Sequence, residues 1–464
     1  MSRLNIPKSS RYRKRVGAFG RIDVKHDEST LDFNTAAECY NFDTASGALT
    51  TGYGVRQNKN IPATTQRYWV YRYYSDEQNG YVDQYVYQLS NGILRMYDTA
   101  MGDSYYISGT MFPPMHALNY RLNSKDVLLM SCEGRKLFTW DGRILEEHTT
   151  SPVVSSMALH YERLFVTSSE EPTKVFFSQD LDPTNWTIGK DGGGFIELLD
   201  ERGYLNRVVS FGSYLYIFRD HGISRVTAYG DSSEFSVINL FVTAGRIYPD
   251  SIAVCGSVIV FLASDGLYSF DGYDCTRRLS NLDGLIERGS ATASAFFDGK
   301  YYLSCRMNFA DGETVGCEAN DCACNGLLVY DVTSGEYAVS RGLDISFMQS
   351  VTFNGEDMLV CCESGVGGEI AKCGKRFDES LHAHWHGPTT DFSSPDKLKV
   401  LREAYVVNDV PVTVGIDYDG KRKEVNVKTG GGRKRLNVNC RRASVSVDCD
   451  GGECRVEPIT VIYS

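Results

Sequence analysis

Short runs that alternate between hydrophobic and polar residues fill most of this chain, and turn residues separate them. The clearest example is residues 163–186, where RLFVTS and KVFFSQ read as two strands joined by a polar turn with a proline. The tight turn DPTNW follows, in which Asp182 and Pro183 bend the chain and Trp186 fills a gap between packed layers. We therefore expect a structural role for these three residues and a buried indole.

The same hairpin recurs along the chain as a short strand, a tight turn and a strongly apolar strand. It is found at residues 120–132, 158–168, 209–220, 253–264, 294–305 and 351–362. The repeat is about 40 to 50 residues long, which is typical of four-stranded propeller blades. Residues 68–108 add one more antiparallel sheet, and the amphipathic helices that a parallel α/β fold needs are missing. The pattern predicts an all-β fold with a six- or seven-bladed β-propeller.

After His382 the pattern changes to strands that alternate strictly with period two, such as PVTVGIDY and ASVSVDC. This change predicts a small C-terminal antiparallel β domain, a sandwich or a barrel. The expected organisation is a basic N-terminal arm (1–30), a β-propeller (31–390) and the C-terminal domain (391–464).

The charge of the chain is −11 over 464 residues, which argues against a surface built to grip nucleic acid broadly. Basic residues nevertheless crowd both ends. At the start they include Arg11, Arg13, Lys14 and Arg15, which either form a solvated segment or dock onto an acidic partner or nucleic acid. The N-terminus has no apolar core after its basic residues, and no apolar run is long enough for a membrane span.

Two groups of residues could bind a metal ion. Cys317, Cys322 and Cys324 lie close together in a turn-rich loop, and His382, His384 and His386 alternate on one strand face. The simpler interpretation of the cysteines is that all 14 are reduced and act as small hydrophobes. The simpler interpretation of the histidines is a polar strand near a domain junction. The sequence leaves metal binding open at both places and predicts no cofactor.

Four stretches carry a resemblance to a known family. They are residues 165–186, GGFIEL (193–198), the hairpin at 205–226 and TDFSSPDKLKVLREAYV (390–406). Their order resembles the propeller-containing tail nozzle, or packaged-DNA stabilisation, proteins of bacteriophages. The resemblance covers about residues 155 to 410 and concerns structural motifs, so it carries over no catalytic residue.

The resemblance implies a structural virion protein of a phage tail, made in the cytoplasm of the host bacterium. Copies of such a protein form a ring, a nozzle or tail-channel component, that retains packaged DNA and lets it pass on ejection. The implied protein partners are other copies of the chain and portal, adaptor or tail-fibre proteins. Double-stranded DNA is expected to pass without tight binding, and no membrane partner is expected. This chain is shorter than the larger nozzles, so the contacts made by their insertions do not carry over.

Two other classes of function remain open. One is a propeller that recognises a receptor or glycan through aromatic loops. The other is a sialidase-like hydrolase, because Ser178, Asp180, Asp182, Thr184 and Trp186 come near an Asp-box. The spacing to the tryptophan is one residue too long, and Asp182 stands where glycine is usual. Glu197, Asp265 and Asp271 read as turn and strand-end acids, so we expect no enzyme activity.

Overall fold

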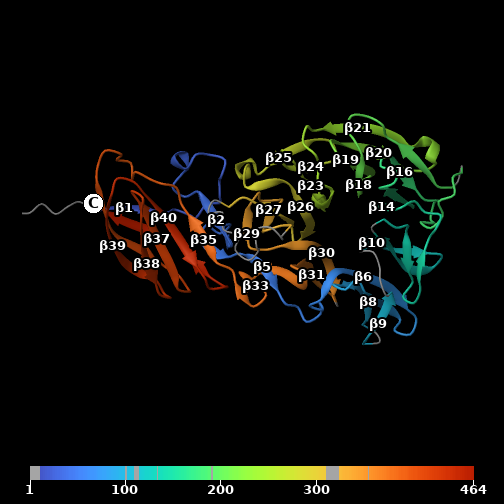
Figure 1. The fold of residues 1–464 in the computed structure, drawn as a ribbon, viewed down its shortest axis with the longest axis horizontal. Helices are drawn as coiled ribbons and strands as arrows, with labels where there is room; N and C mark the ends of the chain where they lie inside the picture. Colours follow the sequence, from blue (N-terminus) through green and yellow to red (C-terminus); the bar gives the residue numbers. More distant parts are fainter. Residues whose placement is uncertain are drawn as a thin grey trace, which may run out of the picture.

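The computed structural model describes residues 11–99, 102–108, 114–132, 134–189, 192–309, 323–353 and 355–464. These residues form an all-β structure in which the only helices are four short 3-10 turns, η1 (Glu28–Thr30), η2 (Ser232–Glu234), η3 (Pro249–Ser251) and η4 (Ser280–Leu282). Antiparallel sheets curve around one half of the molecule, and two further sheets form the other half (Figure 1). No helix in the described ranges is long and apolar enough to cross a membrane.

Six consecutive four-stranded sheets follow each other along the described chain, each with its strands in sequence order. The first three are β6 (Thr65–Ser75), β7 (Gly80–Leu89), β8 (Leu94–Asp98) and β9 (Asp103–Ser108); β10 (Pro114–Leu122), β11 (Lys125–Cys132), β12 (Phe138–Trp140) and β13 (Leu145–Glu147); and β14 (Ser156–His160), β15 (Arg163–Thr167), β16 (Lys174–Phe177) and β17 (Gly194–Glu197).

The next three are β18 (Leu205–Phe211), β19 (Tyr214–Arg219), β20 (Gly222–Thr227) and β21 (Ser236–Val242); β22 (Ala253–Cys255), β23 (Val258–Ala263), β24 (Gly266–Phe270) and β25 (Cys275–Arg278); and β26 (Ile286–Phe297), β27 (Lys300–Met307), β28 (Gly326–Asp331) and β29 (Tyr337–Arg341). The first two strands of the last five sheets are five of the six recurring hairpins in the sequence, because each apolar run and its turn form one antiparallel pair.

A seventh sheet joins distant parts of the chain. It contains β30 (Ile345–Phe353), β31 (Glu356–Glu363) and β32 (Val366–Lys372), and β5 (Tyr53–Arg56) pairs antiparallel with β32 as its fourth strand. The short β33 (Lys375–Arg376) and β34 (Glu379–Ser380) lie beyond β5. Gly54 is required in β5, because a Cβ there would lie 2.1 Å from the carbonyl oxygen of Lys375. The sixth hairpin, at 351–362, forms the β30–β31 pair.

Hydrophobic side chains fill the spaces between neighbouring sheets. Tyr71 and Trp140 belong to a cluster between the first and second sheets. Trp69 and Phe347 belong to one between the first and the seventh, so the series of sheets closes on itself. This closed arrangement of four-stranded sheets, residues 53–380, is consistent with a β-propeller and is called the sheet ring below.

The other half of the molecule, the two-sheet domain, takes strands from both ends of the chain. One sheet has the order β1 (Tyr12–Arg15), β42 (Thr460–Tyr463), β36 (Lys399–Val406) and β39 (Gly432–Cys440). The other has β2 (Glu38–Tyr40), β35 (Ala383–His386), β40 (Ala443–Cys449), β37 (Val412–Tyr418) and β38 (Lys421–Val427). A small sheet adds β3 (Phe42–Asp43), β4 (Leu49–Thr51) and β41 (Arg455–Val456).

The division of the chain differs from the expected one at its N-terminal end. The expected arm, 1–30, is part of the two-sheet domain from residue 11 onward, because β1 pairs with β42 and both Val16 and Phe19 are buried. Residues 38–51 and β35, expected in the propeller, also pair within this domain. The domain therefore combines residues 11–51 with residues 381–464, and the sheet ring lies between them in sequence.

Candidate functional site

The turn at residues 182–186 is tight and internally hydrogen-bonded. The Asp182 carboxylate accepts bonds from the backbone N–H and the hydroxyl of Thr184, at 3.0 and 2.7 Å. Pro183 stands between these two residues. Trp186 is 8% exposed and packs in the cluster between the second and third sheets, beside Leu129 and Val166. The residues that resemble an Asp-box thus form a turn, and Trp186 fills the space between two sheets.

The basic residues of the N-terminal segment lie on an edge strand. Arg13, Lys14 and Arg15 belong to β1, which pairs only with β42 among the described strands, and Arg11 precedes it. At the other edge of this sheet, β39 carries Arg433, Lys434 and Arg435. Both strands lie at the end of the molecule farthest from the sheet ring (Figure 1). Two basic segments that are distant in sequence therefore lie at one end of the molecule, on opposite edges of one sheet.

The acids considered for glycoside hydrolysis lie apart and serve the fold. Asp271 accepts backbone bonds from Tyr273 and Asp274 in a turn. Asp265 accepts a bond from the Tyr268 hydroxyl at 2.8 Å. Glu197 ends β17, two sheets before the one that carries Asp265 and Asp271. These three carboxylates do not converge on one cavity.

A cavity of about 180 Å³ lies where the first strands of several sheets meet. Its charged lining consists of Arg67 on β6, His116 on β10, Arg207 on β18 and Asp250 on η3. Arg207 donates to the carbonyl oxygen of Pro249 at 2.8 Å, and Arg67 donates to that of Ser346 at 3.2 Å. This cluster has no signal in the sequence, because its members are single residues at distant positions that become neighbours only when the ring closes.

Burial sets the charges in this cavity. It lowers the pKa of His116 to about 3, with help from the two arginines, so the imidazole is neutral at pH 7. Burial raises the pKa of the Asp250 carboxyl, although Arg207 and Arg67 oppose that shift. The cavity offers one carboxylate beside two guanidinium groups. That set lacks the second carboxylate that glycoside hydrolysis needs.

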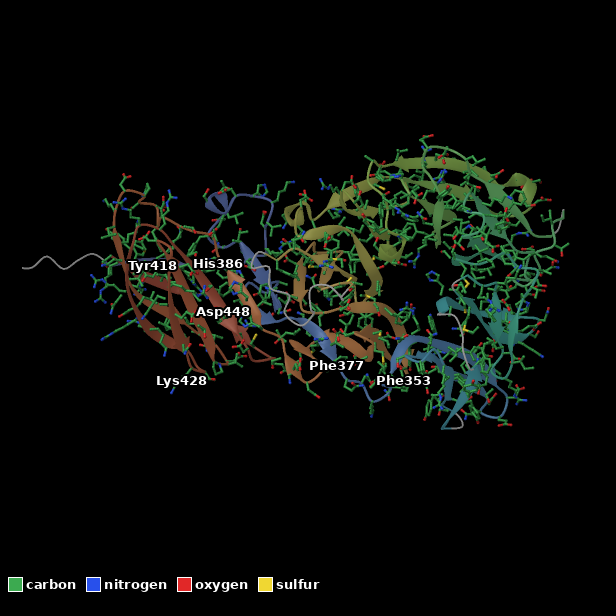
Figure 2. All side chains as sticks on the ribbon, in the orientation of Figure 1. Phe353, Phe377, His386, Tyr418, Lys428 and Asp448 are labelled. Carbon is green, nitrogen blue, oxygen red and sulfur yellow. The ribbon has the colours of Figure 1, made fainter. Side chains whose placement is uncertain are left out.

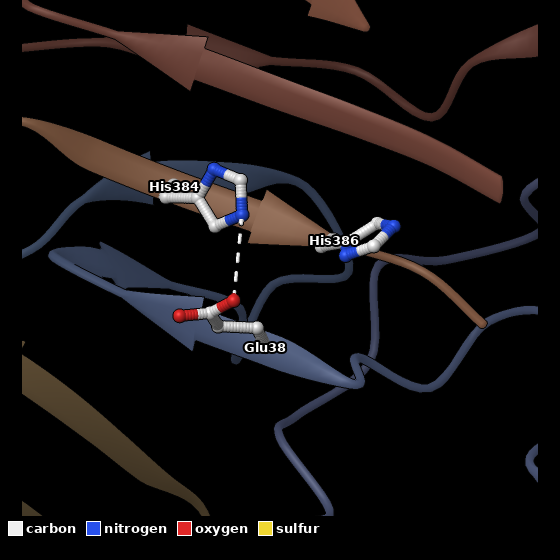
Figure 3. A group of neighbouring side chains, drawn as sticks. All are labelled: Glu38, His384 and His386. Atoms are coloured by element: carbon white, nitrogen blue, oxygen red, sulfur yellow. Dashed lines mark ion pairs between the residues drawn. The ribbon is translucent and has the colours of Figure 1, made fainter. Parts of the chain in front are cut away.

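His384 and His386 lie on β35, between β2 and β40, and His382 directly precedes this strand. His386 lies on the side of the two-sheet domain that faces the sheet ring (Figure 2). The ring centroids of His382 and His384 are 6.4 Å apart, and those of His384 and His386 are 6.1 Å apart. His384 Nε2 lies 4.0 Å from a carboxylate oxygen of Glu38 on β2 (Figure 3). The alternation in the sequence places the imidazoles on one face, as β-strand geometry requires.

Acidic and hydroxyl groups from β40 hold these histidines. Asp448 approaches Nδ1 of His384 at 2.5 Å and Nε2 of His382 at 3.5 Å. Ser444 approaches Nε2 of His386 at 2.7 Å. Arg422 on β38 lies 3.2 Å from the second oxygen of Asp448. Two triads have ligand atoms within 4.8 Å of one another and can hold a metal: Glu38, His384 and His386; and His382, His384 and Asp448.

The environments of the outer two histidines differ. The hydrogen bond to Asp448 raises the pKa of His382 to about 9, whereas burial lowers the pKa of His386. The pKa of the Asp448 carboxyl falls well below its usual range, because its bonds to His382 and His384 outweigh its burial. Glu38 and Asp448 had no signal in the sequence. Each lies on a different strand, β2 and β40, and the pattern of each strand is ordinary.

The other suspected metal site falls mostly outside the described residues. Cys317 and Cys322 lie outside them, and Cys324 is buried. Its backbone N–H donates to the Asp344 carboxylate at 2.9 Å. Elsewhere in the described residues, burial raises the pKa of the thiols of Cys132 and Cys255. These cysteines behave as small buried hydrophobes.

No protein-family model matches this chain, and no curated protein sequence does. Among solved structures, it is similar to BBS1N in its complex with ARL6DN soaked with lead, with 10% identity and a TM-score of 0.44. That match covers 66% of this chain and 93% of the other. The same complex soaked with mercury gives 10% identity and a TM-score of 0.42, over 66% and 92% of the two chains.

Proposed function

We propose that this protein is a structural component of a bacteriophage tail, a nozzle or tail-channel ring that retains packaged DNA and lets it pass on ejection. The proposal takes the sheet ring as a seven-bladed β-propeller and the two-sheet domain as a β-sandwich fixed to it. It rests on the resemblance of residues 155 to 410 and on one structural observation, the separation of charge between the two halves.

Acidic residues outnumber basic ones across residues 52–380, whereas basic residues outnumber acidic ones in residues 381–464. The exposed Arg13 and Arg15 of β1 and Arg433 and Arg435 of β39 add a basic end to the two-sheet domain. A basic end and an acidic ring on one chain are complementary surfaces on neighbouring copies. Such head-to-tail contacts close into a ring when the rotation between copies permits it.

The same charge pattern suits a channel that DNA must leave. Each phosphate neutralised by a protein adds salt-sensitive affinity, so a lining that carries an acidic excess holds duplex DNA weakly. The basic end then serves contacts with other copies or with portal, adaptor or tail-fibre proteins. In this proposal the protein is made in the host bacterial cytoplasm, ends in the virion tail and needs neither a cofactor nor a membrane.

A second candidate function is recognition of a receptor or glycan. The first sheet exposes an unusual set of aromatic side chains: Tyr74, Tyr81, Tyr97, Tyr105 and Tyr106. A cavity of about 390 Å³ beside them is lined by Tyr73, Tyr105, Tyr106 and Trp140 together with polar groups. Tyrosine-rich concave surfaces suit binding of this kind. Such a role is compatible with a place in the tail, and incubation with sialosides or polysaccharides should release no sugar.

The ring proposal is tested by measuring the assembly of the purified chain with mass photometry and negative-stain imaging at low and high salt. We expect closed rings at low salt that dissociate as salt rises. Arg433→Glu combined with Arg435→Glu should abolish them, because the basic end then repels the acidic ring of the next copy. The control variant, Arg95→Glu with Lys125→Glu, reverses two exposed charges on the sheet ring instead and should assemble normally.

Duplex DNA binding provides the second measurement. We expect affinity in the high micromolar range or weaker at physiological salt. A chain that stays monomeric at every salt concentration, or that binds duplex DNA tightly with a steep salt dependence, contradicts the proposal.

A further inference from the structure

Glu38, His384 and His386 bring one carboxylate and two imidazoles to a common point between β2 and β35 (Figure 3). Their ligand atoms lie within 4.8 Å of one another, and His384 Nε2 is 4.0 Å from a Glu38 oxygen. In a tetrahedral zinc site the ligand atoms are about 3.3 Å apart, as bonds of about 2.0–2.2 Å require. Rotamer adjustments of less than an ångström therefore bring these three groups to bonding distance of one ion.

We propose that Glu38, His384 and His386 bind one divalent transition-metal ion of the zinc class. Two imidazoles and a carboxylate suit zinc, nickel or cobalt and not calcium or magnesium, which take oxygen ligands. The side chains are shielded, with exposures of 19% for Glu38, 12% for His384 and 24% for His386. The set leaves a fourth position to a water molecule.

The groups behind the ligands have the arrangement that metal sites use. Asp448 engages His384 at Nδ1, so the opposite nitrogen, Nε2, is directed at Glu38. Ser444 engages His386 at Nε2, which leaves Nδ1 for the ion. A carboxylate or hydroxyl on the far nitrogen of a histidine fixes the tautomer and orients the ring for coordination. Both histidines therefore have the outer partner that coordination requires.

The alternative triad of His382, His384 and Asp448 is less suited to an ion. Asp448 already balances two histidines and Arg422, so an ion there would displace the partner that orients His384. His382 is also the most exposed of the three histidines, at 39%, and contacts Asp450 on its other nitrogen. The two triads share His384, and variants at the unshared residues distinguish them.

An ion at this position would clamp the junction of the two halves. β2 lies shortly before β5, where the chain enters the sheet ring, and β35 follows β34, where the chain leaves it. Bound metal thus connects the incoming segment to the outgoing one. This inference does not depend on the proposed tail function, because it concerns the fold of a single copy.

The test uses the purified full chain, stripped of metal with a chelator and then given Zn²⁺ or Co²⁺. We expect one ion per chain by calorimetry and elemental analysis, and a higher Tm with Zn²⁺. The Co²⁺ complex should show d–d bands without thiolate charge transfer, which separates this site from the 14 cysteines. Glu38→Gln, His384→Ala and His386→Gln should each lose the binding and the rise in Tm.

Two histidine variants serve as controls. His382→Ala should keep the ion, and His26→Ala, which removes an exposed histidine paired with Asp23, should keep it as well. Asp448→Asn should weaken binding about 10- to 100-fold, as expected for an outer partner. Because His384→Ala removes a packed ring, the conservative Glu38→Gln and His386→Gln carry the result if that variant fails to fold.

Four outcomes would overturn the inference. Zn²⁺ binding that survives both Glu38→Gln and His386→Gln excludes this triad. Loss of binding in His382→Ala with retention in His386→Gln assigns the ion to the other triad. Thiolate charge transfer in the Co²⁺ spectrum, or no stoichiometric binding by the unmodified chain, also refutes it.

Discussion

Trp186→Ala should destabilise the protein by about 3 kcal/mol. A buried tryptophan removes about 150–250 Å² from water, which corresponds to about 4 to 6 kcal/mol at ~25 cal/mol per Å². Trp186 is buried between the second and third sheets, but its Nε1 has no hydrogen-bond partner among the described residues. Burying an unpaired N–H costs about 1–3 kcal/mol, and truncation removes that cost together with the packing. The expected loss therefore lies at the lower end of the range for tryptophan truncation.

Trp140 offers a matched comparison. It is also buried, at 4% exposure, but its Nε1 donates to Gln84 Oε1 at 3.2 Å. Replacement by phenylalanine removes similar volume at both positions. Trp186→Phe also removes an unpaired donor, whereas Trp140→Phe leaves a buried acceptor without its bond. Trp140→Phe should therefore cost about 1–3 kcal/mol more than Trp186→Phe.

The assay is urea unfolding followed by far-ultraviolet circular dichroism, with the change in stability taken from the midpoint at an unchanged slope. A loss below about 1 kcal/mol for Trp186→Ala would place the indole at the surface and contradict its role between sheets. An equal or larger cost for Trp186→Phe than for Trp140→Phe would show that the indole N–H of Trp186 is satisfied in solution.

Two further predictions concern ring closure and acid stability. Gly54→Val should lower the urea midpoint strongly, because its Cβ would collide with a backbone carbonyl beside β5. Gly189→Ala, which has open space around it, should leave the midpoint unchanged. Equal midpoints for the two variants would refute the closure role of β5. Arg135 lowers the pKa of Glu147, so that carboxylate stabilises the fold above its unfolded pKa of about 4.3 and loses this contribution as the pH falls further. The deficit of Glu147→Gln at pH 7 should therefore shrink toward pH 3 in urea titrations, and a deficit that stays constant over this range would contradict the role of the Arg135 pair.

The sheet ring was predictable because its signals are local. In each recurring hairpin, a short turn joins two strands of the same sheet, and their apolar side chains pack against the neighbouring sheets. A stretch of about a dozen residues is therefore enough to indicate the fold class. The turn at 182–186 was readable for the same reason, since Asp182 and Thr184 hydrogen-bond to each other across two positions. Contacts between residues that are close in sequence can therefore be predicted from the sequence pattern.

The closure of the ring and the N-terminal half of the two-sheet domain had no such signal. β5 has four residues, and its partner strand lies more than 300 residues away, with Val55 opposite Ile370. β1 reads as a basic arm because three of its four side chains are charged, yet its backbone pairs with β42. Charged residues are common on edge strands, where they discourage pairing with other molecules, so the basic pattern did not exclude a strand.

The candidate metal site was half predictable. The alternation of His382, His384 and His386 gave their common face from the sequence alone. Glu38 and Asp448 reach them from β2 and β40, which pair with β35 on opposite sides. Residues 38 and 448 are separated by almost the whole chain, so no spacing rule could have combined them with the histidines.

The shared topology also predicts that the two halves lose structure together. Phe19 packs edge-on against Trp385, with ring centroids 4.8 Å apart, and Trp385 Nε1 donates to the carbonyl oxygen of Gly20 at 3.2 Å. Phe19→Ala should cost about 3–5 kcal/mol in the two-sheet domain. Because that domain anchors the segment that leads into β5, the damage should extend to the edge of β32 in the sheet ring.

Hydrogen exchange followed by mass spectrometry can resolve this coupling. In Phe19→Ala we expect faster exchange in peptides from β35 and β40, and also in those from β5 and β32. The control is Phe195→Ala, which truncates a side chain that is 43% exposed on β17 and should change neither set. If β5 and β32 keep their protection while β35 and β40 lose theirs, the ring closes without help from the two-sheet domain. In that case the N-terminal residues have a role confined to the domain in which they pair, and their removal would leave the ring intact.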